Sequence, residues 1–291
     1  MKKKAYAKIN LYLDVISKYD NGYHEVNTIM QTVSLADDIE ILLEGEGVSL
    51  VCDKAEIPSD RRNIAWRAAE AFLSECPEIS CKGISISIKK NIPSEAGMGG
   101  GSADGAAVLC ALNEMFGYPI AFERLLEIGG DIGADVPFCM VGGTAFATGK
   151  GTDIEPLPDM PDSYIVIAKG SQGVSTPWAF GELDRIYDNF SRRAYSPYDI
   201  SSLKQSIEAG NVAGMGKELY NVFEKAVFPI CKEALDIKNT MLGYGSCGAL
   251  MSGSGTAVFG LFDNEERANE ACSALTSKGY FSCVAQPVSK L

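Results

Sequence analysis

Residues 93–107 read PSEAGMGGGSADGAA, and this stretch decides how the chain folds. An alternating segment, GISISIK over residues 83–89, runs into it and predicts a strand. Apolar residues at helical spacing follow it: Ala106, Leu109, Leu112 and Phe116. A strand, a glycine-rich turn and a helix start together form an anion site. N–H groups without Cβ crowding can close on a phosphate, and the helix start carries about half a positive charge. The chain is therefore expected to handle a nucleotide phosphate.

Other interpretations of the glycines fit less well. A flexible linker does not usually lie between a strong strand and a strong helix. The loop is not a Walker A motif, because no Gly-Lys-Ser or Gly-Lys-Thr follows it at the required spacing. The later Gly149-Lys150-Gly151 also fails, since its last residue is neither Ser nor Thr. The GxGxxG at residues 243–248 follows a helical segment and precedes an apolar strand, which is the reverse of the dinucleotide-binding order.

The composition restricts the class of partner. The chain has 291 residues, enough for one large or two medium domains, and a formal net charge of −12. This charge argues against a nucleic acid or an anionic membrane as a partner. An acidic protein that binds polyphosphate must gather its few cations locally, and we expect it to recruit a divalent metal.

Cysteine usage and the N-terminus predict a cytoplasmic protein. Nine cysteines occur without a CxxC pair, which indicates buried thiols in a reducing compartment rather than disulfides or a zinc site. Residues 2–4 are lysines, as at the start of a secretory signal, but Lys8, Asn10 and Asp14 interrupt the apolar segment that such a signal needs. No uninterrupted apolar run reaches membrane-spanning length. We expect a monomer or a weak homodimer.

Strands come first along the chain and helices later, without strict alternation, which indicates an α+β protein. Strands are expected at residues 6–16, 25–34, 38–43, 48–52, 164–168 and 280–285, and helices at 63–76, 122–128, 264–275 and between 178 and 242. Three prolines in residues 155–161 forbid regular structure. We expect the boundary there, between an N-terminal domain of residues 1–156 and a C-terminal domain of residues 157–291.

A lysine and an aspartate stand in apolar surroundings. Lys8 and Asn10 share one face of an apolar strand, because strand side chains alternate; the alternative is an edge lysine that deters aggregation. Asp135 lies within GADVPF, residues 133–138, and a carboxylate buried there would need a partner such as a lysine. Alone, Asp135 could equally be a helix cap or a turn residue. A buried Lys–Asp pair beside a phosphate loop is much harder to explain as a cap or a turn.

Two further segments suit ligand recognition. The segment NGYH, residues 21–24, contains the only histidine, and nothing suggests a second metal ligand for it. Tyr23 and His24 are better interpreted as a recognition pair, with one ring stacked on a base and one side chain bonded to its edge. The segment MSGSG, residues 251–255, is a second glycine-rich turn between strands, although an ordinary hairpin would look the same.

Taken together, these segments resemble the GHMP kinases, the superfamily of galactokinase, homoserine kinase, mevalonate kinase and phosphomevalonate kinase. Residues 93–103 are similar to its second signature and residues 251–255 to its third. Four segments closely resemble the branch that phosphorylates a cytidyl-linked methylerythritol: AKINL (7–11), GYH (22–24), GADVPF (133–138) and STP (175–177). The resemblance covers nearly the whole chain in order. It implies an N-terminal domain like domain 2 of ribosomal protein S5 and a C-terminal α/β sandwich.

The resemblance also implies a reaction: phosphoryl transfer from ATP, with Mg²⁺, to the 2-hydroxyl of the methylerythritol in the non-mevalonate isoprenoid pathway. Asp135 would accept the hydroxyl proton, and Lys8 would hold Asp135 ionised and favour the alkoxide. Tyr23 and Phe180 would sandwich the cytosine, with His24 on its edge. The implied ATP-binding residues are Asn63, Ile64, Lys90, Pro93, Gly97, Met98, Gly99, Gly100, Gly101, Ser102 and Ala103. Of these, Asn63, Ile64 and Lys90 would lie near the adenine, and Ser102 is also the candidate Mg²⁺ contact. The implied acceptor-binding residues are Asn10, Tyr23, His24, Thr176 and Phe180, with Gly253, Ser254 and Gly255 near the site.

Some positions depart from the family's pattern. Glu95 places a carboxylate close to the ATP loop, and Met98 replaces the common leucine, which is a tolerable exchange. The segment NVFE, residues 221–224, lacks a second acidic residue and leaves Asn221 and Glu224 without a role. Two alternatives remain open. One is another GHMP kinase of a small alcohol, whose substrate would offer no base to Tyr23 and His24. The other is a catalytically silent nucleotide-binding regulator.

Overall fold

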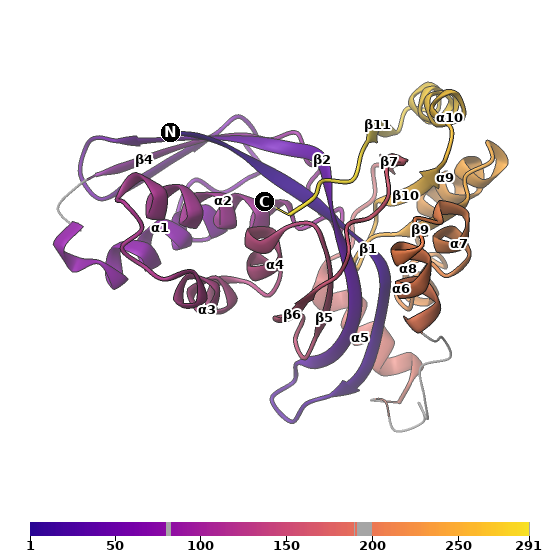
Figure 1. The fold of residues 1–291 in the computed structure, drawn as a ribbon, viewed down its shortest axis with the longest axis horizontal. Coiled ribbons are helices and arrows are strands. Elements are labelled where there is room, and N and C mark those ends of the chain that lie inside the picture. Colours follow the sequence, from indigo (N-terminus) through magenta and orange to yellow (C-terminus); the bar gives the residue numbers. More distant parts are fainter. Residues whose placement is uncertain (80–82, 189, 191–199, 291) are drawn as a thin grey trace. The chain divides into compact units, whose positions relative to one another are not determined.

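The computed structural model describes residues 1–79, 83–188, 190 and 200–290, which form two compact units (Figure 1). Unit 1 consists of residues 1–7, 35–92 and 99–141, and unit 2 of residues 8–34, 93–98 and 142–291. Strands β1 (Lys2–Lys18) and β2 (His24–Leu43) contribute residues to both units. No single cut in the sequence therefore separates the units, and the boundary after residue 156 stays a prediction about sequence domains.

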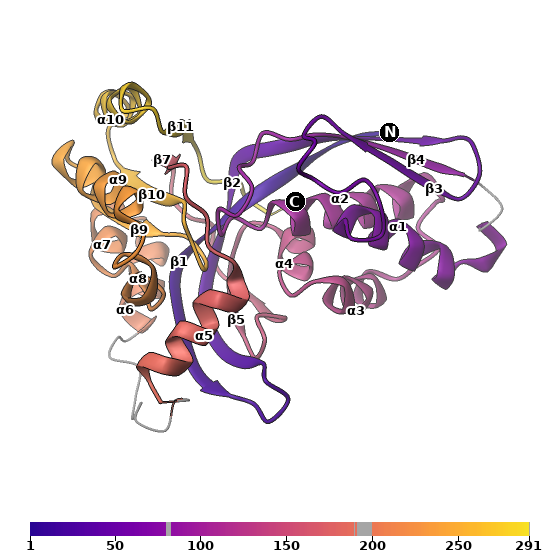
Figure 2. The same ribbon diagram turned by 180° about the vertical axis from the view of Figure 1, so that it is seen from behind.

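Unit 1 is a small sheet covered by helices, as Figures 1 and 2 show. β3 (Val48–Cys52) runs parallel to β4 (Ile84–Lys89), and β4 pairs antiparallel with the last part of β2, Asp38–Leu43. The isoleucines of β4 are buried while its serines are half-buried, so the predicted alternation is confirmed. The helices of unit 1 are α1 (Ile64–Glu75), α2 (Gly100–Met115), α3 (Phe122–Ile132) and α4 (Val136–Val141), with a 3₁₀ turn at Pro77–Ile79.

Unit 2 contains a four-stranded antiparallel sheet in the order β11-β7-β10-β9. These strands are β7 (Tyr164–Lys169), β9 (Gly248–Met251), β10 (Val258–Phe262) and β11 (Phe281–Ala285). Two longer helices, α9 (Lys232–Gly243) and α10 (Glu265–Ser277), pack against this sheet (Figure 2). The other helices of the unit are α5 (Thr176–Ile186), α6 (Ile200–Glu208), α7 (Val212–Lys217) and α8 (Glu224–Val227).

Three short strands extend the pairing of β1 and β2 within unit 2. β5 (Thr144–Thr148) pairs antiparallel with Thr28–Gln31 of β2 and with β6 (Asp153–Pro156), and β8 (Tyr220–Asn221) runs parallel to β1. The sequence did not predict β5, β6 or α4. The expectation that residues 155–161 lack regular structure is wrong at its start, because β6 includes Glu155 and ends at Pro156. The expected interruption between residues 34 and 38 is wrong, because β2 continues through it.

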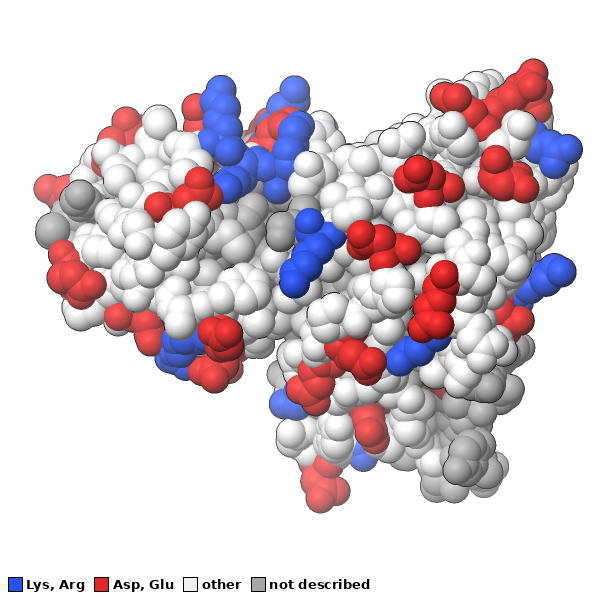
Figure 3. Space-filling model, viewed as in Figure 1, with Lys and Arg blue, Asp and Glu red and all other residues white. Residues whose placement is uncertain are grey.

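The remaining expectations about the fold are partly tested. The mixture of sheets and helices confirms an α+β protein. Within the described residues, no helix is both long and apolar enough to cross a membrane. The eight cysteines in that part of the chain carry free thiols, three of them buried and five half-buried. Acidic and basic side chains are interspersed on the face drawn in Figure 3. The whole chain has 38 acidic and 26 basic residues, so acidic residues are in excess.

Candidate functional site

The phosphate loop ends at the start of α2, in unit 1. Gly99 has φ +67°, a left-handed conformation that glycine adopts without strain, and α2 begins at the next residue. Gly99 carries no side chain that could cap the helix. The N–H groups of the first turn are therefore left for a ligand, as an anion site requires.

Glycines also let α1 approach the start of α2. A Cβ at Gly105 would lie 2.6 Å from Cγ2 of Ile64, and one at Gly101 would lie 3.4 Å from its Cδ1. Asn63 caps α1, with its Oδ1 accepting from the N–H of Ala65 at 2.9 Å. The structure thus brings Asn63 and Ile64 to the beginning of α2, beside the predicted loop residues.

Asp135 lies in the corner between α3 and α4, also in unit 1. A Cβ at Gly133 would lie 3.7 Å from Oγ of Ser102, so the chain two residues before Asp135 packs beside the start of α2. Asp135 itself is half-buried. The expectation of a buried carboxylate is therefore met only in part.

Lys90 occupies a buried ion cluster. Its Nζ donates to Asp37 Oδ2 at 2.5 Å and to Asp104 Oδ2 at 2.7 Å, and all three side chains are almost completely buried. Burial lowers the pKa of Lys90, but the two carboxylates outweigh it and raise that pKa above its ordinary value. A Cβ at Gly100 would lie 3.4 Å from this Nζ. Lys90 therefore supports the first turn of α2, a role the sequence reasoning missed; its contact with adenine stays a prediction.

Lys8 begins a hydrogen-bonded chain in unit 2. Its Nζ donates to Asn10 Oδ1 at 2.8 Å, Asn10 Nδ2 donates to Thr28 Oγ1 at 2.8 Å, and Thr28 Oγ1 donates to the carbonyl of Tyr12 at 2.7 Å. Lys8 and Asn10 are 4% and 3% exposed. The shared strand face is confirmed, and a lysine that protects a sheet edge would be exposed instead.

The second glycine turn, between β9 and β10, packs on the phosphate loop within unit 2. Ser252 Oγ donates to the carbonyl of Gly97 at 2.9 Å, and a Cβ at Gly253 would lie 2.6 Å from that carbonyl oxygen. Ser254 Oγ and Thr176 Oγ1 are 2.9 Å apart. Four predicted site residues therefore meet here, and the turn is more than a hairpin connection.

His24 lies in a cluster of aromatic and charged residues in unit 2. Its ring stacks on Phe180 with 4.7 Å between centroids, and its Nε2 lies 2.7 Å from Asp184 Oδ1. Lys18 Nζ donates to the other oxygen of Asp184 at 2.5 Å. Burial by itself would raise the pKa of Asp184. The hydrogen bonds from Lys18 and His24 lower it by more, so the pKa lies below its ordinary value. Because a carboxylate only accepts, Nε2 of His24 carries the hydrogen of this bond.

Tyr23 lies differently from His24. It is 60% exposed, and Lys150 Nζ lies 4.3 Å from the centroid of its ring, within range of a cation–π interaction. The ring that covers Phe180 is that of His24. The sandwich of a base between Tyr23 and Phe180 stays a prediction. Sequence reasoning missed Lys150 and Asp184, although the rejected Gly149-Lys150-Gly151 motif drew attention to the first.

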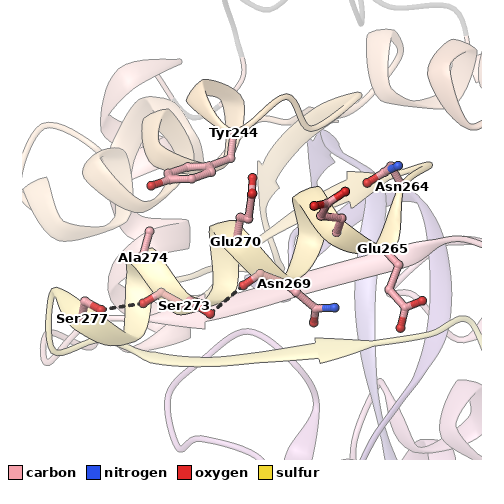
Figure 4. Close-up of a pocket in the computed structure, with 9 residues that line it drawn as sticks. Tyr244, Asn264, Glu265, Asn269, Glu270, Ser273, Ala274 and Ser277 are labelled. Atoms are coloured by element: carbon pink, nitrogen blue, oxygen red, sulfur yellow. Dashed lines mark hydrogen bonds between the residues drawn. The ribbon is translucent and has the colours of Figure 1, made fainter.

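Two hollows on the units are lined by other residues. One of about 1050 Å³ runs along α10, and Figure 4 shows its wall. Glu265, Glu266 and Glu270 line it, which makes it unsuitable for a polyphosphate. Another, of about 510 Å³, lies in unit 1 among residues of β1, β2 and β4. Neither is lined by a predicted site residue.

Known proteins resemble both halves of the chain. The model of the GHMP kinases N terminal domain matches residues 63–143, and that of the GHMP kinases C terminal matches residues 203–280. A 4-diphosphocytidyl-2-C-methyl-D-erythritol kinase of Clostridium acetobutylicum is 42% identical over 270 residues, 93% of this chain and 94% of that protein. Its counterpart in Caldicellulosiruptor bescii is 43% identical over 279 residues, 94% of each chain.

Solved structures agree with these relatives. A crystal structure of 4-(cytidine 5'-diphospho)-2C-methyl-D-erythritol kinase matches with a TM-score of 0.81 and 30% identity, over 98% of this chain and 99% of that one. Mevalonate kinase of L. major matches with a TM-score of 0.77 over 99% and 97% of the two chains. At 18% identity, this second match shows a shared fold alone.

Proposed function

Because the chain belongs to the 4-diphosphocytidyl-2-C-methyl-D-erythritol kinases within the GHMP kinases, we propose that it phosphorylates the 2-hydroxyl of 4-diphosphocytidyl-2-C-methyl-D-erythritol. ATP would be the donor, and the products would be the 2-phosphate and ADP, on the route to isoprenoid precursors. The observation that carries the proposal is the glycine loop at the start of α2 in a chain 42% identical to a named relative over 93% of its length. A cytoplasmic location and a monomeric or weakly dimeric state belong to the same proposal.

The phosphates of ATP would lie on the first turn of α2. Gly99, Gly100 and Gly101 present N–H groups without Cβ atoms, and the helix start favours negative charge. Asn63 and Ile64 begin α1 next to this turn, which supports their assignment to the adenine side of the nucleotide.

Proton transfer would fall to Asp135. A carboxylate accepts the hydroxyl proton as the phosphoryl group moves, and such a base contributes about 10²–10⁴-fold to the rate. Lys8 would favour the developing alkoxide through its charge. Its bond to Asn10, which Thr28 fixes in turn, supports this role because the ammonium is held in one orientation.

The cytosine of the acceptor would be recognised around His24. Asp184 holds Nε2 of the imidazole, so the orientation of this ring is set before a substrate binds. Tyr23 offers an exposed ring for stacking, and Lys150 beside it offers a donor for an acceptor atom of the base. These features support a nucleotide-linked acceptor over a simple alcohol.

Mg²⁺ is part of the same proposal. Among the residues that the structure describes, no three His, Cys, Asp or Glu side chains could hold a metal by themselves. This arrangement fits an ion that is carried mainly by the phosphates, as Mg²⁺ is in many nucleotide sites. The Ser102 hydroxyl, at the start of α2, is the oxygen of this chain that we assign to it. When bound, the ion would neutralise charge on the phosphates.

The test is ADP release with Mg-ATP and a panel of acceptors: diphosphocytidyl-methylerythritol, mevalonate, phosphomevalonate and homoserine. We expect turnover with the cytidyl acceptor alone. Asp135→Asn should abolish it, while Asp131→Asn, an exposed aspartate in α3, serves as the matched control. Turnover on another acceptor would overturn the substrate assignment, and nucleotide binding without any turnover would favour a silent regulator.

A further inference from the structure

Asn221 clamps the second glycine turn, although the sequence left this residue without a role. Its Nδ2 donates to the carbonyls of Met251 at 2.6 Å and Gly253 at 2.8 Å, and its Oδ1 accepts from the N–H of Phe223 at 2.9 Å. The side chain is buried, with 3% of the residue exposed. All the donor and acceptor atoms of this amide are therefore spent on backbone, and two of the three bonds hold the turn.

The clamp is anchored on β1, the strand that carries Lys8. Asn221 belongs to β8 and pairs with Leu13 of β1, and the next N–H, that of Val222, donates to the carbonyl of Leu13 at 3.0 Å. Strand pairing fixes the backbone of Asn221 and so fixes where its amide can reach.

Glu224 adds a second clamp from the same segment. Its Oε1 accepts from the N–H of Met251 at 3.0 Å, and its Oε2 pairs with Lys238 at 2.6 Å. Two side chains, three residues apart, thus hold the end of β9 and the turn that follows it.

On its other side the turn holds the phosphate loop, also within unit 2. Ser252 Oγ donates to the carbonyl of Gly97, and the N–H of Ala257 donates to the carbonyl of Ala96 at 3.2 Å. A Cβ at Gly97 would collide with the carbonyl of Ser252. The two segments are packed backbone against backbone, so a shift of the turn must move Gly97.

We infer that Asn221 is a positioning residue for the phosphate loop. Asn221 holds the glycine turn in the position from which Ser252 can donate to the carbonyl of Gly97. Glu224 supports the same turn through the N–H of Met251. This inference rests on the proposed function, because the binding of ATP phosphates by the loop is part of that proposal.

Asn221→Asp is the sharpest perturbation. The carboxylate keeps the volume and the oxygen that accepts from Phe223, which in turn touches Phe180, but it replaces the donor with an oxygen that faces two carbonyls. We expect the Kd of adenylyl imidodiphosphate, measured by calorimetry, to rise about tenfold, because the turn loses both of its hydrogen bonds from Asn221 and part of that loss reaches the phosphate loop. The Kd of the cytidyl acceptor should rise by much less, because the turn meets the predicted acceptor residues only through the contact of Ser254 with Thr176.

Asn113→Asp is the matched control. Asn113 is also buried, and its amide also bridges backbone, donating to the carbonyl of Ile120 at 2.9 Å and accepting from its N–H at 3.1 Å. It lies in the last turn of α2, roughly 20 Å along the helix from Gly100. This variant should lose stability comparably and bind the ATP analogue as the wild type does.

Ser252→Ala tests the link between turn and loop, even if Asn221→Asp does not fold. Alone, it should weaken binding of the analogue, and combined with Asn221→Asp it should add less than its separate effect, because both act through one contact. Additive effects, unchanged binding in Ser252→Ala, or equal effects of Asn221→Asp and Asn113→Asp would overturn the inference. Failure of the wild type to bind the analogue would instead overturn the proposed function, and the inference with it.

Discussion

Replacing Lys90 with Met should cost far more stability than replacing Lys4 with Met, although each lysine holds an aspartate at 2.5 Å within unit 1. The side chains of Lys90, Asp37 and Asp104 are 6%, 0% and 3% exposed, whereas those of Lys4 and Asp38 are 55% and 43% exposed. Methionine keeps most of the lysine stem and removes the charge. The comparison therefore sets a buried ion cluster, with two aspartates, against an exposed ion pair.

The loss for Lys90→Met follows from what remains behind. Without the ammonium, two buried carboxylates face each other, and breaking a buried pair in this way costs about 3–5 kcal/mol. One of the carboxylates can take up a proton, so the loss should be smaller at about pH 5 than at about pH 8. The pair of Lys4 is screened by water and salt, so its removal should leave the free energy of unfolding unchanged within error.

Urea unfolding measures this difference. Tryptophan fluorescence reports on unit 1 through Trp66 and on unit 2 through Trp178, and circular dichroism follows the whole chain. A shift of the midpoint at an unchanged m-value gives the loss of stability. The reasoning is refuted if the two variants unfold at the same urea concentration, or if Lys90→Met loses as much at about pH 5 as at about pH 8.

Three further outcomes are expected. Burial raises the pKa of Asp104 to about 7 from its ordinary value of 3.8. The stability that its protonated form contributes is therefore complete below pH 3.8 and is lost as the pH rises through about 7. In urea unfolding, the free energy of unfolding of Asp104→Asn should not show this dependence on pH. Gly97→Ala should lower the Tm more than Gly279→Ala does. Both glycines have positive φ, but only a Cβ at Gly97 would meet backbone, which costs about 1–3 kcal/mol more. Equal shifts of the two Tm values would contradict this. Asp184→Asn should raise the KM for the cytidyl acceptor about tenfold and leave the KM for ATP unchanged, since one charge-assisted hydrogen bond is weakened; initial rates of ADP release distinguish the two.

Elements with a clear period could be predicted from the sequence. Alternating isoleucines gave β4, helical spacing gave α2, and the glycine cluster between them gave the phosphate loop. α4 escaped because VPFCMV is apolar on all sides and has no period to detect. β5, TAFAT, has one large apolar residue and β6, DIEP, ends in a proline, so neither shows the alternation of a strand.

Contacts between residues distant in sequence could not be predicted. Asp37 lies inside β2, where an aspartate is unfavourable, but its carboxylate accepts from Lys90 and from the N–H groups of Asn91 and Ile92. The partner of His24 is 160 residues away. Local patterns nominated His24, Lys8 and Asp135 as chemical groups, and only the fold could supply their neighbours.

The strands shared by the two units restrict how the chain can fold as the ribosome makes it. Thr28–Gln31 of β2 must wait for β5, which lies more than a hundred residues later, and Val33 forms a bridge with Pro287. A nascent chain that lacks its last residues therefore has unpaired backbone in one of its first strands. Because unit 2 takes residues from 8–34 as well as from 142–291, it cannot be completed until its last strands have been made, and truncated products should be recognised by chaperones and proteases as unfinished.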